Sequence, residues 1–182
     1  MESPSSQRQI RFFSSLCQLI EITAESMLTQ QGDTPLGMFI LISGSVQGSY
    51  IYHDKYYKLE KKFDPGDVLG EIGCYLNCKR SASLVCDTSC SLLFLNRCYM
   101  DYIKVNCKLL YKSLGVCVAA YKDVMVTSRR RLLRTAIFYL KHAHNRVLGE
   151  LAFNISEKDF EQGSIIAKQF DLTNDYLFIE SG

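Results

Sequence analysis

Short β-rich segments follow one another between residues 19 and 95, with turn sequences between them. The segments are 19–23, 38–42, 46–52, 56–63, 83–85 and 91–95, and a further strand ends at Leu69. Residues that favour turns, mainly Gly, Asp, Ser and Pro, gather at 31–33, 43–45 and 64–67. Many short strands at this spacing indicate a closed or sandwiched all-β unit.

The sequence pattern changes after Arg97, where a helical period replaces the strand period. Apolar residues are spaced by 4, 3, 4 and 3 at Leu110, Leu114, Cys117, Tyr121 and Val124. This stripe predicts one long helix from residue 108 to about 128. We expect it to form a two-helix seam between two copies of the chain. The alternative is that the stripe packs on its own β unit.

A basic run, 129–131 with Arg134, follows this helix. Such a run usually forms a solvated face, and a patch that faces phosphates is the alternative. A helix is then predicted to about residue 144, followed by a strand at 151–155. Another helix is predicted from Ser156, which is a good N-cap, and Asp159 three residues later would complete a capping box. Thr173 is predicted to cap a further helix.

The composition limits the function classes. Hydrophobic residues make up 47% of the 182 residues and charged residues 22%, which is sufficient for a packed core, and the net charge of +2 neither requires nor excludes a nucleic-acid partner. No signal-peptide core is visible at the start. The most apolar stretch, 109–126, contains Lys112, Lys122 and Asp123, so we expect no membrane span and a cytoplasmic location.

The chain has eight cysteines, which we expect to be reduced thiols that act as small buried hydrophobes. A metal site is the alternative, but it needs four converging ligands, and the sequence has no C-x-x-C pair. Enzyme activity has little support, because no Ser-His-Asp order, metal-ligand cluster or P-loop is found. The sequence therefore indicates a binding protein with no required cofactor.

The stretch GEIGCYLNCKRSAS, residues 70–83, carries an acid near one end and an arginine near the other. We expect a strand, one short helix over 71–76 and a return to strand, with free backbone N–H groups at the helix start that can bind an anion. Arg80 suits a phosphate, Glu71 suits a sugar hydroxyl, and Gly70 permits close approach of a ligand. This combination predicts a nucleotide monophosphate site. The alternative is a surface Glu–Arg pair worth about 0–1 kcal/mol.

Residues 65–72 and 80–85 resemble the phosphate-binding cassette of cyclic-nucleotide-binding domains, whose pattern is Gly-Glu-[Leu/Ile], eight or nine residues, then Arg-[Ser/Ala/Thr]-Ala. The turns at 31–33 and 42–46 also resemble turns of that family. Residues 99–106 resemble the start of the dimer helix in the Crp/Fnr transcription regulators, and 133–140 and 155–177 resemble the opening of their winged helix.

This resemblance implies an α+β fold: a double-stranded β-helix, or jelly-roll-like β-roll, followed by a long dimerisation helix and a partial helix-turn-helix. The implied domains are 1–128, the β-roll with its dimer helix, and 129–182, an incomplete DNA-binding region. The implied function is a dimeric regulator that senses a cyclic nucleotide, most plausibly cAMP. The alternative is a dimeric DNA- or protein-binding module whose pocket is vestigial or takes another effector.

The resemblance also implies roles for particular residues. Gly70 and Glu71 would hold the ribose, with Ile72 beside them. Arg80 and Ser81 would hold the cyclic phosphate, with the Ala82 backbone nearby. Thr127 and Ser128 would touch the purine. The DNA contacts would come from Arg129, Arg130, Thr173 and Asn174.

Overall fold

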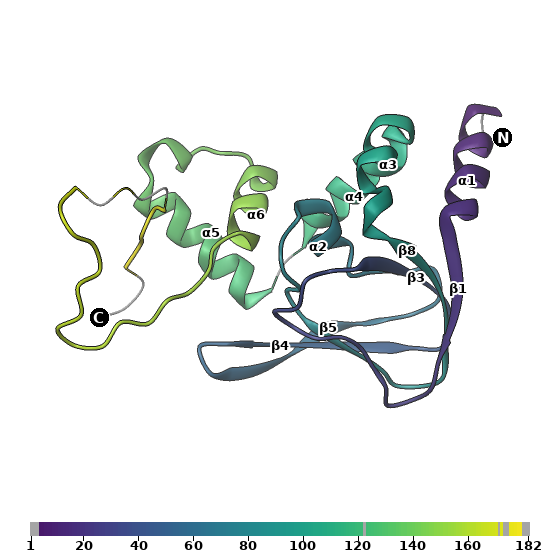
Figure 1. Ribbon diagram of the computed structural model, residues 1–182, viewed down its shortest axis with the longest axis horizontal. Coiled ribbons are helices and arrows are strands. Elements are labelled where there is room, and N and C mark those ends of the chain that lie inside the picture. The colour runs from purple at the N-terminus through teal and green to yellow at the C-terminus, as the bar shows by residue number, and fades with distance from the viewer. Residues whose placement is uncertain (1–3, 122, 171, 173–174, 180–182) are drawn as a thin grey trace.

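The computed structural model describes residues 4–121, 123–170, 172 and 175–179. Its β-roll is built from two four-stranded antiparallel sheets, with strand orders β1-β8-β3-β6 and β2-β7-β4-β5 (Figure 1). The strands are β1 (Cys17–Ile22), β2 (Met27–Thr29), β3 (Gly37–Ser43), β4 (Val46–Tyr52), β5 (Lys55–Phe63), β6 (Val68–Leu69), β7 (Ser83–Cys86) and β8 (Cys90–Asn96). All the predicted strands of the β unit are confirmed, and β2 was not predicted.

The core of the β-roll lies between the two sheets. Alternate residues of β4 point inward, and Val46, Tyr50 and Tyr52 are buried, as the two-residue period of a strand requires. Val46 joins a cluster to which both sheets contribute: Phe39, Leu41, Val46, Leu69, Leu84, Cys86, Cys90 and Leu92. This shared core confirms the β-roll part of the predicted α+β fold.

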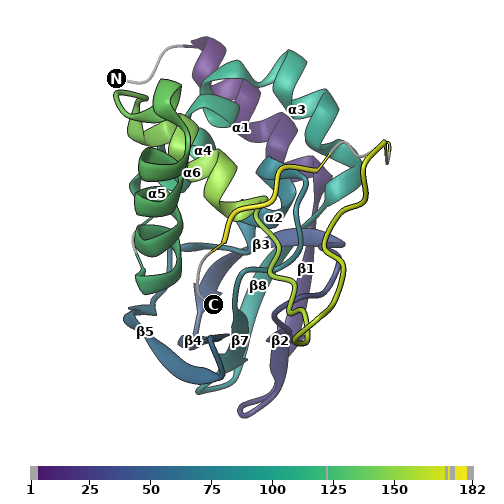
Figure 2. The same cartoon turned by 90° about the vertical axis from the view of Figure 1, so that its left-hand side faces the viewer.

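The helices lie along one end and one side of the β-roll (Figures 1 and 2). They are α1 (Pro4–Leu16), α2 (Glu71–Leu76), η1 (Arg97–Tyr99), α3 (Met100–Asn106), α4 (Lys108–Ala120), α5 (Val124–Ala136), η2 (Phe138–Leu140) and α6 (Asn145–Phe153). Helix α1 was not predicted; it packs on α3, where the rings of Phe12 and Tyr102 lie 5.0 Å apart.

The prediction of one long helix over 108–128 is wrong, because the helix is interrupted: α4 ends at Ala120 and α5 begins at Val124. Tyr121 has extended backbone angles, and Asp123 is the N-cap of α5, its carboxylate accepting a 2.6 Å hydrogen bond from the Val126 N–H. The Tyr50 hydroxyl accepts a hydrogen bond from the Val124 N–H at 3.2 Å. These contacts satisfy backbone donors at the new helix start and so stabilise the break.

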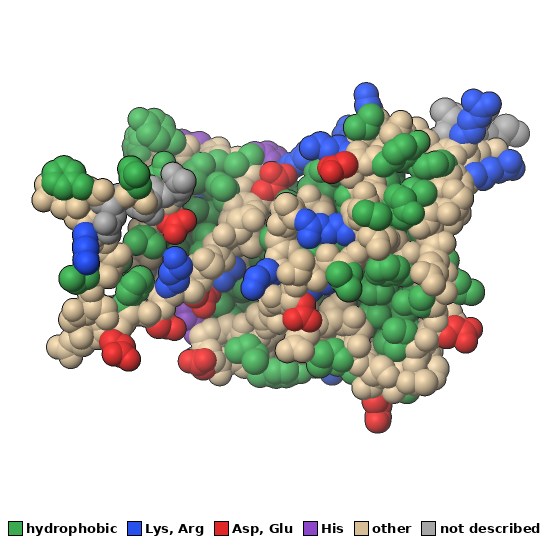
Figure 3. Space-filling view, viewed as in Figure 1, with side chains coloured by type: hydrophobic (Ala, Val, Ile, Leu, Met, Phe, Trp, Pro, Cys, Tyr) green, Lys and Arg blue, Asp and Glu red, His purple; other side chains and the backbone are tan. Residues whose placement is uncertain are grey.

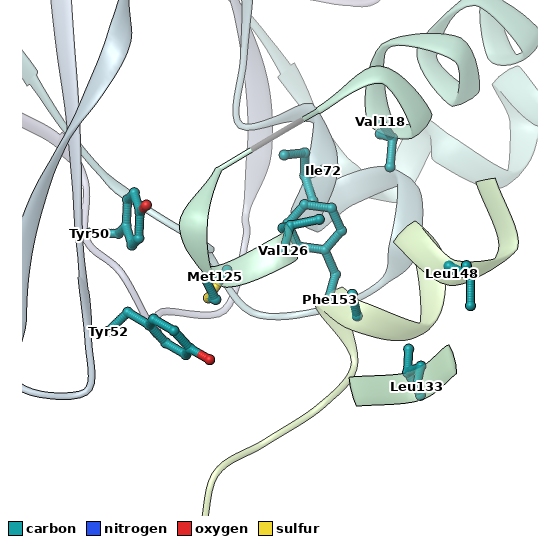
Figure 4. Close-up of a cluster of buried hydrophobic side chains, with 10 residues drawn as sticks. Tyr50, Tyr52, Ile72, Val118, Met125, Val126, Leu133, Leu148 and Phe153 are labelled. Carbon is teal, nitrogen blue, oxygen red and sulfur yellow. The ribbon is translucent and has the colours of Figure 1, made fainter. Parts of the chain in front are cut away.

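One residue of the apolar stripe, Leu114, is buried within its own chain, as is Val118 beside the stripe. Leu114 lies in a cluster with Met38, Cys74 and Ile103, and Val118 joins α4 to α2, α5 and α6 in a second cluster (Figure 4). Cys117 and Val124 of the stripe are exposed, so a seam between two copies stays a prediction.

The C-terminal predictions also need correction. The predicted strand at 151–155 begins inside α6, which His144 caps and which buries Leu148, Ala152 and Phe153 at helical spacing. Among the described residues after Phe153, none lies in a helix or strand, so the helix predicted from Ser156 does not form. Thr173 and Asn174 lie outside the described residues. The described chain thus contains no second helix of a helix-turn-helix, and the predicted domain boundary at 128/129 falls inside α5.

Many apolar side chains of this C-terminal part are exposed, and Figure 3 shows hydrophobic groups spread over its surface. All eight cysteines lie in described parts of the chain and are free thiols. Within those parts, no cluster of three or more His, Cys, Asp or Glu side chains is arranged to hold a metal ion, and no helix is long and apolar enough to cross a membrane.

Candidate functional site

The segment 70–80 forms a compact loop around the short helix α2. Gly70, the residue before α2, has a φ of 70°, and Asn77, the residue after it, has a φ of 55°. Both values are left-handed, a conformation that glycine and asparagine tolerate best. The Cys78 N–H donates to the Gly73 carbonyl at 3.2 Å and closes the helix end. The predicted helix over 71–76 is confirmed.

Arg80 is the hub of this loop. Its backbone N–H donates to the Asp33 carbonyl at 2.8 Å, and its carbonyl accepts from the Gly32 N–H at 2.9 Å, so it is anchored on the turn at 31–33. Its guanidinium donates to the Gly70 carbonyl at 2.6 Å and to the Gly37 carbonyl. Only 7% of the residue is exposed, and this burial lowers the pKa of the guanidinium.

Glu71 stands at the first position of α2, and burial raises the pKa of its carboxyl to about 7. The backbone N–H of Glu71 and the nearby charges of Arg80 and Lys61 lower this pKa, but their effect is smaller than that of desolvation of the carboxylate. The carboxyl is therefore about half ionised at neutral pH, and a hydrogen-bond donor placed beside it would favour the ionised form.

The loop lines one side of a cavity of about 720 Å³, a volume ordinary for a small-molecule site. All six residues that the sequence predicted for the sugar and phosphate line it: Gly70, Glu71, Ile72, Arg80, Ser81 and Ala82. The opposite walls come from β5 and from the α4–α5 junction, including Lys58, Lys61, Cys117, Tyr121 and Asp123. Glu71 and Arg80 thus both line one common hollow.

Aromatic residues of the cavity wall were missed in the sequence. The rings of Tyr50 and Tyr57 stack at 5.2 Å, with 11° between their planes. They are directly paired across β4 and β5, a register that could have been counted outward from the turn at 53–54. Tyr121 lies at the α4–α5 junction, where its hydroxyl is hydrogen-bonded to the Asp123 carboxylate and burial raises the pKa of both groups.

Thr127 and Ser128, predicted to touch the purine, do not line this cavity. Thr127 instead faces a smaller hollow on α5 together with Arg130. The break between α4 and α5 explains the difference, because residues after it no longer continue the line of α4.

Arg129 and Arg130, predicted to contact DNA, are both engaged within the chain. Arg129 donates to the Ala152 carbonyl at 3.2 Å and to the Glu157 carboxylate at 2.8 Å. Arg130 is only 8% exposed and donates to the Ala119 carbonyl at 3.2 Å. These contacts tie α5 to α4 and to the end of α6, so the two side chains do not form an open phosphate-facing patch.

Comparison with known proteins points to the same region. Residues 19–103 match the family model of the cyclic nucleotide-binding domain. A search of curated proteins finds no sequence match.

Solved structures share the fold at low sequence identity. The regulatory domain of Toxoplasma gondii PKA, in a co-crystal structure with cAMP, aligns with a TM-score of 0.53 and 20% identity over 80% of this chain and 50% of that chain. The regulatory subunit of a cAMP-independent protein kinase A from Trypanosoma brucei aligns with a TM-score of 0.52 and 18% identity over 58% of this chain and 39% of that chain.

The catabolite activator protein of Thermus thermophilus aligns over 84% of this chain and 80% of that chain at 16% identity, with a TM-score of 0.47. The chain spans half or less of the two kinase chains. The comparisons therefore establish the β-roll fold of a cyclic nucleotide-binding domain and do not single out the Crp/Fnr branch.

Proposed function

We propose that this chain is a regulatory binding module, not an enzyme, and that its cavity of about 720 Å³ takes a purine cyclic nucleotide, with cAMP as the first choice. One observation carries the proposal: Glu71, Arg80, Ser81 and Ala82 line one hollow. These four residues lie in the region that matches the cyclic nucleotide-binding domain.

The chemistry of the lining residues fits such a ligand. The Glu71 carboxylate can accept a hydrogen bond from a ribose hydroxyl, which would stabilise its ionised form. Arg80 has five N–H groups, of which two bind the carbonyls of Gly70 and Gly37 and a third contacts Cys74, so donors remain for a phosphate oxygen. The aromatic wall of β4 and β5 offers flat apolar surface to a base.

The route of regulation follows from the position of the α4–α5 junction. Tyr121 and Asp123 line the cavity, and Asp123 also caps α5. A nucleotide that contacts these residues would bind one arrangement of α5 and α6 more tightly than another and so shift their populations. We propose this junction as the output of the module.

The transcription-regulator role implied by the Crp/Fnr resemblance is a narrower proposal, as is a homodimer through residues 108–128. Both need a surface for a further partner. The Arg129 and Arg130 side chains, expected at a DNA interface, are used in intrachain contacts. We therefore place regulation of a protein partner ahead of DNA binding.

Isothermal titration calorimetry with cAMP, cGMP and AMP tests nucleotide binding directly. Wild type should bind cAMP at one saturable site, and Glu71→Ala and Arg80→Lys should each weaken binding by about tenfold or more, since each removes a hydrogen bond to a charged group. Lys79→Gln is the matched control, because Lys79 is exposed and does not line the cavity. Equal cAMP affinity in wild type, Glu71→Ala and Arg80→Lys would refute this site.

A module that works without a nucleotide is the second candidate. The observation in its favour is that the Arg80 guanidinium already binds two backbone carbonyls, so its role can be structural. A thermal-shift assay separates the two candidates, since a ligand at 100 times its Kd should add about 2.7 kcal/mol to the free energy of unfolding. No shift with millimolar cAMP, cGMP or AMP would favour the second candidate.

A further inference from the structure

A second hollow, of about 480 Å³, lies on α5 beside the start of α6. Helices α5 and α6 lie side by side in both views (Figures 1 and 2). The hollow is lined by Thr127, Arg130, Arg131, Arg134, Thr135 and Asn145. The first four are spaced by 3, 1 and 3 residues, so they occupy one face of α5. None of the six lines the larger cavity.

The charge of this hollow is strongly positive. Its lining includes three arginines and no acidic residue. Arg131 and Arg134 are exposed, and Arg134 donates to the Asn145 side-chain oxygen at 2.7 Å. No ion pair involves these three arginines among the described residues, whereas the neighbouring Arg129 is paired with Glu157. Within the described chain, the charges of Arg131 and Arg134 are thus left without an ion pair, whereas Arg130 has the charge of Asp123 nearby.

Arg130 provides a second, independent observation. It is more than nine-tenths buried, and its Nε has no hydrogen-bond partner in the structure. Its guanidinium lies against Gly149 of α6, where a Cβ would come within 2.6 Å of Nη2. Burial lowers the pKa of Arg130; the nearby Asp123 acts in the opposite direction and the nearby Arg134 in the same direction. Buried polar groups are nearly always hydrogen-bonded, so the charge of Arg130 beneath this face is only partly satisfied by protein acceptors.

We propose that this hollow binds a small phosphate-bearing anion. The exposed guanidinium groups of Arg131 and Arg134 and the Thr127 hydroxyl supply the donors, with the charge of Arg130 beneath them, and a phosphate with its several oxygens and double charge matches them better than a single carboxylate does. The proposal does not depend on cyclic-nucleotide binding, because the two hollows share no lining residue. It assigns a ligand to Arg131 and Arg134, two arginines of the basic run that the DNA prediction did not name.

The test is calorimetric titration of pyrophosphate into the full chain at fixed ionic strength. Wild type should show one saturable site, and Arg131→Gln and Arg134→Gln should each weaken binding by about tenfold or more, as expected for the loss of one charge-assisted hydrogen bond. Both side chains are exposed, so neither change should disturb folding, and circular dichroism checks this. Arg11→Gln on α1 is the matched control; Arg11 is also exposed and does not line the hollow.

Three results would overturn the proposal. One is the lack of saturable pyrophosphate binding to wild type. Another is an equal loss of affinity in Arg11→Gln, which would indicate diffuse attraction to net charge. A third is saturable binding of duplex DNA together with a lack of saturable pyrophosphate binding, which would assign the face to a nucleic acid. Titration of cAMP into Arg134→Gln separates this proposal from the previous one, because its affinity should equal that of wild type.

Discussion

Replacement of Gly70 by alanine is the sharpest test of how the cassette is held together. Gly70 has a φ of 70°, and a Cβ on this residue would overlap with Nη1 of Arg80. Nη1 is the atom that donates to the Gly70 carbonyl at 2.6 Å. The new methyl group would therefore displace the guanidinium from the contact that positions it.

Two costs add up in Gly70→Ala. The left-handed backbone costs an alanine about 1–2 kcal/mol. Loss of a hydrogen bond from a charged group costs about 1.5–3 kcal/mol more. The free energy of unfolding should thus fall by about 2.5–5 kcal/mol, and for a chain of this size each kcal/mol lowers the Tm by about 2–4 °C.

Gly66→Ala is the matched control. Gly66 also has a positive φ, 98°, but a Cβ there meets nothing within 4 Å. Only the backbone cost applies, so we expect a loss of about 1–2 kcal/mol. Urea unfolding of both variants followed by circular dichroism gives the two free energies. If Gly70→Ala is no less stable than Gly66→Ala, the clash with Arg80 is not a constraint on the cassette, and the reasoning fails.

Three further predictions concern the rest of the molecule. The pKa of Glu71 is raised from 4.5 to about 7, so between these pH values the folded state binds a proton that the unfolded state releases. The free energy of unfolding should therefore fall by up to about 3 kcal/mol as pH rises through this window. Urea titrations at pH 5 and 8 measure this fall, which should be smaller in Glu71→Gln than in wild type. Leu114 is 4% exposed and packs within the chain, so Leu114→Ala should lower the free energy of unfolding by about 2–5 kcal/mol. Val116→Ala, at an exposed site, should lower it much less. An unfolding midpoint that depends on protein concentration would instead support a seam between copies. Cys117 is exposed and lines the large cavity, so bound cAMP should slow its reaction with a maleimide and leave that of the exposed Cys98 unchanged; equal protection of both thiols would contradict this placement of the ligand.

Local sequence determined the β-roll and the cassette, because their signals are short-range. The turns at 31–33, 43–45 and 64–67 contain residues that only a few backbone conformations suit, and alternation between them fixes which side of each strand is buried. The helix at 71–76 follows from Gly70 before it and Asn77 after it. The resemblance to the cassette grouped the six residues, and all of them line the cavity; their roles toward a ligand stay a prediction.

Only the tertiary structure decided the aromatic wall and the course of the chain after Ala120. The period of the apolar stripe is the same whether it continues in one helix or breaks, and the break depends on contacts with distant residues, such as the Tyr50 hydroxyl with the Val124 N–H. The same holds for Arg129 and Arg130, since a charge run carries no information about the carbonyls that lie within its reach. Sequence patterns report the local preference of a segment, whereas burial and pairing between remote segments depend on the packing of the whole chain.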